Sequence, residues 1–286
     1  MIRYQVSRKD LERCIETKSP GWLDEARRKT LAFRGARKYG EKSGTWGKIK
    51  SVYMELQHNK CAFCEQKLEG LPYGSILHAV EHFRPKNTVK VWPTSKIRKE
   101  RRITWTFSTG ALHPGGYYLL AYNIFNYTTA CHVCNTTLKG SYFPVEGPRG
   151  PLSPVLEDYK RERPLLLYPL GTVDPHDPEE LIEFQGVLPK PRFRNGFRHR
   201  RATVTIDFFD LTGIWREQLL RERARLLEEL YSALEKEDKN KVERLCSPAS
   251  EHTNCARCFR KLYRKNPGEA TELAEAASRY LNSQSR

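Results

Sequence analysis

The sequence of 286 residues contains no run of about 18 apolar residues, the length that a transmembrane helix requires. Its first residues, MIRYQVSRKDLERC, also lack the apolar segment of a secretory signal. These two absences predict a cytoplasmic protein. The chain is nevertheless 38% hydrophobic and 11% aromatic, which is enough for the core of one large domain or two ordinary ones.

Acidic residues are in the minority, with 34 Asp and Glu against 50 Lys and Arg, so the formal net charge is +16. A charge of this size favours a polyanion such as nucleic acid as a partner, with a merely soluble basic surface as the alternative. Much of it falls in a basic insertion that contains Arg84, Lys86, Lys90, Lys96, Arg98, Lys99, Arg101 and Arg102. Trp92, Trp105 and Phe107 are interleaved with these charges. The mixture suits phosphate pairing and base stacking, although a solvated loop would have the same composition.

Eight cysteines in a reducing compartment are more often metal ligands or free thiols than disulfides. Four of them form two CxxC pairs, Cys61-Ala-Phe-Cys64 and Cys131-His-Val-Cys134. Two such knuckles supply the four thiolates that a tetrahedral structural zinc takes. A thioredoxin-like redox site needs one CxxC and leaves the second unexplained, so unpaired buried cysteines are the remaining alternative.

A second group of candidate zinc ligands lies near the end of the sequence. It has the spacing C-x5-H-x2-C-x2-C and consists of Cys246, His252, Cys255 and Cys258. The number of ligands is right for zinc, but the spacing is compact and irregular, and free cysteines are the alternative. A metal here would staple the chain end.

Apolar periodicity predicts an α+β fold in three parts. Residues 1–57 form a helical N-terminal support, because Trp46, Ile49, Tyr53 and Leu56 recur at helical spacing before Cys61. Residues 58–147 form a core with both CxxC pairs and the basic insertion. Within it, the apolar run from Leu77 to Phe83 predicts a strand that carries Glu81 and His82.

Residues 148–286 are predicted to form an α+β to mainly helical C-terminal region. Leu181–Val187 and Ala202–Ile206 read as strands, with a turn at Asn195-Gly196. A long helix is expected from Leu211, with Thr212 as its cap. Its apolar stripe comprises Ile214, Trp215, Leu219, Leu226, Leu230 and Leu234. Such a stripe usually packs in a core, but a partner protein could cover part of it.

The order of residues in the central part resembles the HNH, or ββα-metal, endonuclease family in its zinc-knuckle form. The matching elements are the first CxxC, the Glu81-His82 pair, Asn126, and the run from Cys131 to Lys139. The resemblance implies that His82, Asn126 and Asn135 take the three motif positions, with Glu81 in the acidic place beside the histidine. The expected core is therefore a ββα-metal unit with a structural zinc.

Phosphodiester hydrolysis explains why these residue types would be needed. His82 is the predicted general base, because a neutral imidazole can take a proton from the attacking water. Glu81 and Asn135 would supply oxygen ligands to a catalytic Mg²⁺ or Mn²⁺, Asn126 would hold the His82 loop, and Lys139 would contact a phosphate. Each has a simpler alternative: His82 a packed core residue, Glu81 an ion-pair partner of nearby arginines, and Asn135 a helix cap.

Longer segments narrow the resemblance further. KCAFCEQKL, VEHFRPK, YYLLAYNIFNYTTACHVCNTTLKGSYFP and RPLLLYPLGTVDPHDPEELIEF occur in this order, as in the PtuB-like nuclease subunits of Septu-type and retron-linked anti-phage systems. For such proteins the family implies DNA cleavage, RNA being a second substrate, and an ABC-type ATPase partner, PtuA-like. The main rival is a non-catalytic zinc-knuckle module that only binds nucleic acid. A third hypothesis is a scaffold that docks a partner through the helix from Leu211.

Overall fold

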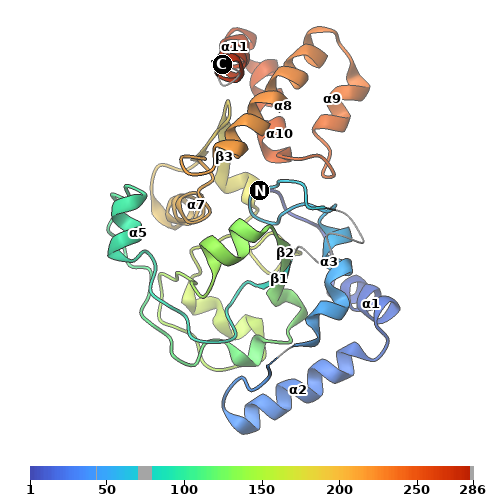
Figure 1. Cartoon of the computed structure of the whole chain (residues 1–286), viewed down its shortest axis with the longest axis vertical. Coiled ribbons are helices and arrows are strands. Elements are labelled where there is room, and N and C mark those ends of the chain that lie inside the picture. The colour runs from blue at the N-terminus through green and yellow to red at the C-terminus, as the bar shows by residue number, and fades with distance from the viewer. Residues whose placement is uncertain (43, 70–78, 284–286) are drawn as a thin grey trace.

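The computed structural model describes residues 1–42, 44–69 and 79–283 (Figure 1), so Leu77 of the predicted strand lies outside the described residues. The N-terminal part is helical, as predicted. Its elements are α1 (Arg8–Lys18), α2 (Trp22–Ala36), the 3₁₀ turn η1 (Thr45–Ile49) and α3 (Lys50–Leu56). α3 ends just before the first CxxC pair and buries Val52, Tyr53 and Met54. α3 therefore anchors the loop of the first CxxC pair in the core.

The central part is a small antiparallel sheet followed by a helix. Strand β1 (Ala79–His82) pairs with β2 (Tyr127–Ala130) in a register that sets His82 opposite Tyr127. The wide-turned π-helix η4 (Val133–Lys139) begins two residues after β2, so that Cys131 lies just before the helix and Cys134 in its first turn. The long connection between the strands contains α5 (Ser95–Glu100), η2 (Tyr118–Leu120) and η3 (Ile124–Asn126). The predicted strand at Glu81-His82 is thus confirmed.

The C-terminal part adds one hairpin and several helices. Its first elements are η5 (Leu156–Glu162), α6 (Pro178–Leu181), β3 (Ile182–Gln185), β4 (Leu188–Pro191) and α7 (Gly196–Phe208). Four more helices follow: α8 (Glu217–Glu235), α9 (Lys239–Leu245), α10 (Thr253–Lys265) and α11 (Pro267–Ser283). Helices together with two small antiparallel sheets make the chain an α+β protein. Within the described ranges, no helix combines the length and the apolar character that crossing a membrane would take.

Buried apolar side chains form two clusters. The larger one runs from Met1 to Leu219 and joins the N-terminal helices, the β1–β2 sheet and α7. The smaller one is formed by α8 to α11 and contains Leu227, Leu230 and Phe259. Figure 1 shows these four helices, in orange and red, gathered at one end of the molecule. β3 and α10 pack against each other and connect the two ends.

Two predictions for the C-terminal part are wrong. Residues 202–206 lie in α7, and the expected turn at Asn195-Gly196 is where that helix begins. The run from Ala202 to Ile206 alternates apolar residues with Thr203 and Thr205 and is rich in β-branched side chains, so it resembles a strand, but its burial in the core holds it in α7. The helix expected from Leu211 begins only at Glu217, and Ile214 and Trp215 are exposed in the preceding loop.

Candidate functional site

The two CxxC pairs, far apart in the sequence, meet in space. One sulfur from each of Cys61, Cys64, Cys131 and Cys134 lies within 4.8 Å of the others. The Cys64 and Cys131 sulfurs are 3.8 Å apart. Four Zn–S bonds of about 2.3 Å in a tetrahedron also set neighbouring sulfurs about 3.8 Å apart. The four cysteines therefore fit a structural zinc ion.

Backbone pairing explains why the two knuckles meet. The Ala62 N–H donates to the Thr129 carbonyl at 3.0 Å, so the backbone of the first knuckle pairs with strand β2. Gln57, at the end of α3, fixes the same position. Its amide donates to the Thr129 carbonyl at 2.8 Å, and its Oε1 accepts the Thr129 N–H at 2.8 Å. The cluster is thus held by β2 and α3 together.

Arg216, in the loop before α8, supplies positive charge to the cluster. It donates to the Cys134 sulfur at 3.3 Å and to Gln66 Oε1 at 2.8 Å. Burial alone raises the pKa of a thiol, but hydrogen bonds from the other cysteines and the charge of Arg216 bring the pKa of Cys64 well below its usual value. Arg216 was not predicted, because it lies 82 residues from Cys134 and no local motif marks it.

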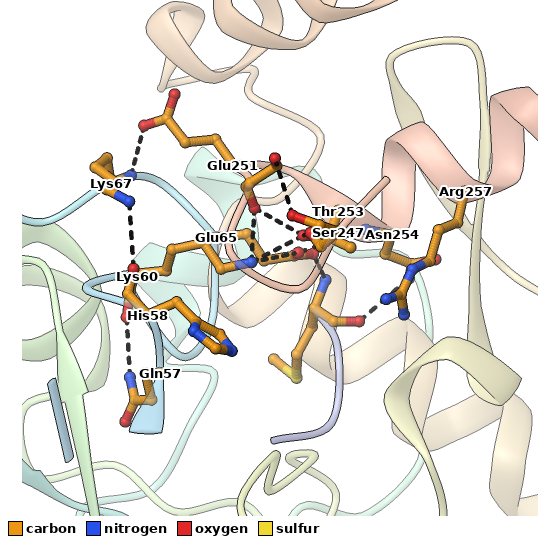
Figure 2. A network of polar contacts seen from close by, with 12 residues as sticks. Gln57, His58, Lys60, Glu65, Lys67, Ser247, Glu251, Thr253, Asn254 and Arg257 are labelled. Atoms are coloured by element: carbon orange, nitrogen blue, oxygen red, sulfur yellow. Dashed lines mark hydrogen bonds and ion pairs between the residues drawn. The ribbon is translucent and has the colours of Figure 1, made fainter. Parts of the chain in front are cut away.

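The first knuckle is also tied to the loop before α10 (Figure 2). The Lys60 ammonium donates to the Ser250 carbonyl at 2.7 Å and to the Thr253 hydroxyl at 2.8 Å. On the other side of the knuckle, the Lys67 N–H donates to Glu251 Oε1 at 2.7 Å. Figure 2 shows these residues with Glu65 at their centre. The C-terminal helices are therefore fastened to the loop that presents Cys61 and Cys64.

The second predicted zinc site does not assemble. The ligand atoms of Cys246, His252, Cys255 and Cys258 form no metal-sized group in the described part of the chain. His252 Nε2 lies 3.1 Å from Glu222 Oε2, and the Cys255 thiol donates to the Gly186 carbonyl at 3.4 Å. The Cys258 thiol donates to Asn254 Oδ1 at 3.4 Å. The reason for the error is that this CxxC is part of the continuous helix α10, not of a knuckle loop.

His82, at the end of β1, is buried and neutral. Its Nε2 lies 3.1 Å from the Ala121 carbonyl, which can only accept, so Nε2 carries the proton. Nδ1 then has a lone pair and makes no hydrogen bond to a described residue. Burial first, and the charge of Lys86 second, lower the pKa of His82 to about 3. Trp46 and Tyr127 pack edge to face against the ring at 4.6 and 5.1 Å between centroids.

Glu81 pairs with Lys139 of η4. Lys139 Nζ lies 3.1 Å from Glu81 Oε1 and donates to the His82 carbonyl at 3.2 Å. Burial raises the pKa of Glu81 and lowers that of Lys139, and their mutual attraction opposes both shifts. Lys139 is fully buried, so its place differs from the predicted phosphate contact. It binds the end of β1 to η4.

Asn126 clamps the chain just after His82. Its Oδ1 accepts the Arg84 N–H at 2.7 Å, and its Nδ2 donates to the Arg84 carbonyl at 3.0 Å. Nδ2 also donates to the Leu120 carbonyl at 3.1 Å. The side chain is fully buried and all of these contacts are to backbone. Asn126 therefore fixes the loop that follows β1.

Asn135 lies in η4, and Lys86 lies in the loop that follows β1. The Asn135 side chain is half-buried and hydrogen-bonds to no other described residue, although its N–H donates to the Cys131 carbonyl. Lys86 lies over the rings of Trp46 and Tyr39, at 4.7 and 5.3 Å. Its role was not predicted, because in the sequence it is one basic residue of many. The structure thus gathers Glu81, Lys139 and Lys86 near His82, and places Asn135 one turn before Lys139.

The basic insertion is partly a structural element. Trp92 is only 1% exposed and packs against Phe208, so it is not free to stack on a base. Arg101 donates to the carbonyls of Asp207 and Phe208 at 2.8 Å, at the end of α7. The Trp105 indole donates to Asp207 Oδ2 at 2.7 Å. These contacts lock the insertion onto α7.

Comparison of the chain with protein-family models, with curated proteins and with solved structures gives no match.

Proposed function

We propose that the chain is a metal-dependent HNH-type endonuclease that hydrolyses phosphodiester bonds in nucleic acid, with DNA as the expected substrate and RNA as the second. The observation that carries the proposal is the state of His82. Its ring is neutral, one nitrogen is bonded to Ala121, and the other has no described partner. A base for proton transfer needs this combination of fixed orientation and a free lone pair.

The order of elements supports the same proposal. β1 and β2 are antiparallel, and the helix η4 follows with Cys134 and Asn135 in its first turns. This is the order that a ββα-metal unit requires. The four-cysteine cluster lies at the far end of the same strands, so a zinc ion there would hold β2 and η4 in place beneath His82.

In the proposed reaction, His82 Nδ1 accepts a proton from the water that attacks phosphorus. The pKa of about 3 keeps the ring neutral throughout the physiological range but makes it a weak base, so the proposed step needs the negative charge of a bound phosphate to raise this pKa. Ala121 and Asn126 hold the base in place, the first through Nε2 and the second through the following loop. Lys86 adds positive charge beside the substrate.

The residues around β1 also offer oxygen ligands for a hard cation. Lys139 contacts Oε1 of Glu81, which leaves Oε2, and the Asn135 amide has no described partner. Carboxylate and amide oxygens are ligands of Mg²⁺, and Mn²⁺ takes the same set. Such a cation, when bound, would neutralise the charge that develops on the phosphate.

The likeness to PtuB-like subunits extends the proposal to defence against phage with an ABC-type ATPase partner. Ile214 and Trp215, 66% and 65% exposed, are apolar side chains that such a partner could cover. They directly precede Arg216, which contacts the cysteine cluster. Co-purification with an ABC-type ATPase, lost in a Trp215→Glu variant, would support this part.

One observation favours the rival, a non-catalytic nucleic-acid-binding module. Glu81 is already neutralised by Lys139, and both side chains are buried. In that case the pair only joins β1 to η4, and Mg²⁺ has no place. The module predicts binding to nucleic acid that neither Mg²⁺ nor His82 changes.

A cleavage assay separates the two functions. Supercoiled plasmid, single-stranded DNA and RNA are incubated with the zinc-loaded protein, with and without Mg²⁺ or Mn²⁺, alone and with the ATPase. The matched variants are His82→Ala and His132→Ala, the latter an exposed histidine in the second knuckle. The nuclease predicts cation-dependent cleavage that only His82→Ala abolishes. Retained binding with no cleavage under any of these conditions would favour the module.

A further inference from the structure

A second candidate site lies behind the loop that follows β1. A cavity of about 440 Å³ opens between this loop, η5, the loop 172–176 and α7. Its volume is in the range of small-ligand sites, about 300–1,000 Å³. None of the proposed zinc ligands or catalytic residues lines it.

The walls of the cavity are largely aromatic and apolar. The rings come from four separate segments, and they are those of Phe83, Tyr159, Tyr168 and Phe197. Leu156 and Val173 add aliphatic surface. Convergent ring faces of this kind favour a flat, apolar ligand body.

The charged side chains of the lining are mostly cationic. Arg84, Lys160, Arg163 and Arg201 stand against one carboxylate, Asp174. Asp174 is fully used, because it pairs with Arg201 and accepts the N–H groups of Tyr168 and His176 at 3.0 Å. Of the other three cations, Arg84 pairs with Glu162 and Arg163 with Glu146, whereas Lys160 is exposed and has no described ion pair. The one cation in excess suits a ligand with a single anionic group.

Arg84 pairs with the buried carboxylate of Glu162 and still has donors to offer to the cavity. It is 6% exposed, and only its Nε donates, to Glu162 Oε2 at 3.1 Å. Its terminal amino groups have no hydrogen-bond partner among the described residues. The rings of Phe143 and Tyr159 hold the guanidinium at 5.0 and 5.4 Å. A planar guanidinium fixed in this way presents a fork of N–H donors that matches a phosphate or carboxylate.

We propose that this cavity binds a small ligand with a planar base and a phosphate, that is, a nucleotide. Arg84 binds the phosphate from inside, and Lys160 adds charge at the rim. The rings of Tyr159, Tyr168 and Phe197 receive the base.

The ligand would also reach the candidate catalytic residue. Arg84 is two residues after His82, and Asn126 clamps its backbone on both sides. Occupancy of the cavity would therefore restrain the end of β1. This regulatory consequence rests on the proposed nuclease function, whereas binding itself does not.

Isothermal titration calorimetry on the full chain tests the proposal without any need for cleavage. The probes are AMP, GMP, CMP, UMP, adenosine and inorganic phosphate. At least one nucleotide is expected to bind at one site, more tightly than adenosine and phosphate. Arg84→Lys, which keeps the charge but loses the fork, should weaken that binding about tenfold or more. Lys160→Gln, at an exposed position that folding does not need, should weaken it by a smaller factor.

Two controls locate the binding. Lys96→Gln removes an exposed cation on α5, with a side chain that is 83% exposed, and should change nothing. His82→Ala should also leave binding intact, which separates the cavity from the catalytic site. The proposal is overturned if no nucleotide binds at millimolar concentration, or if adenosine or phosphate binds as tightly as the nucleotide. Unchanged binding in both the Arg84→Lys and Lys160→Gln proteins would overturn it as well.

Discussion

Two groups of four candidate zinc ligands occur in this chain, and only one of them assembles. Cys61, Cys64, Cys131 and Cys134 lie in two knuckle loops that backbone pairing with β2 brings together. In the other group, Cys255 and Cys258 lie on one uninterrupted helix, and their thiols donate to oxygens of different segments. A CxxC pair thus predicts a metal site when its backbone forms a turn and a second CxxC pair lies beside it in the fold. Ligand number alone is not sufficient.

The largest effect is expected from breaking the assembled group. Cys131→Ser should abolish tight zinc binding and cost several kcal/mol of unfolding free energy, because the metal joins two distant segments. Zinc content by mass spectrometry and the midpoint of chemical unfolding measure both effects. A Cys131→Ser protein with wild-type stability would show that the cluster is not a structural metal site.

Arg216 tests whether charge around the sulfurs matters. Arg216→Gln keeps the polar character of the side chain but removes the cation that donates to Cys134 and Gln66. Zinc affinity is expected to fall about 10- to 100-fold, as for other residues that contact metal ligands. Competition with a chelator of known affinity measures the change. Arg221→Gln, which removes a half-buried arginine of α8 that pairs with Glu217 and not with the cysteines, is the matched control.

The pH dependence of stability tests the surroundings of His82, at the other end of the strand pair from the assembled group. The folded-state pKa of His82 is about 3, against about 6.5 when unfolded, so the unfolded chain binds more protons between these values. Stability should therefore be lost as pH falls from about 6.5 towards 3, with His82 contributing about 2 kcal/mol of that loss at pH 5.

His82→Gln should flatten this acid slope, measured by urea unfolding without added Mg²⁺. Equal slopes for the wild type and His82→Gln would mean that His82 is not buried as described.

The smallest effect is expected in the group that does not assemble. The Cys258 thiol donates to Asn254 Oδ1 at 3.4 Å, and its sulfur accepts a hydrogen bond from the Phe184 backbone. Cys258→Ser can keep both bonds, so we expect a loss below about 1 kcal/mol and no change in zinc content. If the wild type binds a second equivalent of zinc and this variant does not, the group of Cys246, His252, Cys255 and Cys258 is a zinc site after all.

Sequence patterns predicted the features that depend on residues close together in the chain. The spacing of the CxxC pairs identified the cluster, and the apolar run before Pro85 identified β1. The prediction for the run from Ala202 to Ile206 failed, because the run alternates as a strand does, whereas its burial in the core holds it in α7. Arg216 and Lys86 were not found, because their places depend on segments that meet only after folding.

The predicted catalytic residues divide in the same way. Asn126 and His82 could be proposed from their order in the chain, and whether they act in catalysis stays a prediction. The burial of Lys139 against Glu81 could not be read from spacing, since it depends on how η4 packs on β1. The π-helical turn of η4 contributes to this packing, and no residue pattern signals it.

Rescue of a base-deficient protein tests the central claim most directly. Cleavage of plasmid by zinc-loaded His82→Ala, with Mg²⁺ and the ATPase present, is compared with wild type at equal zinc content. The account predicts a rate about 10²- to 10⁴-fold lower, partly restored by added imidazole. Cleavage by His82→Ala at the wild-type rate would contradict it.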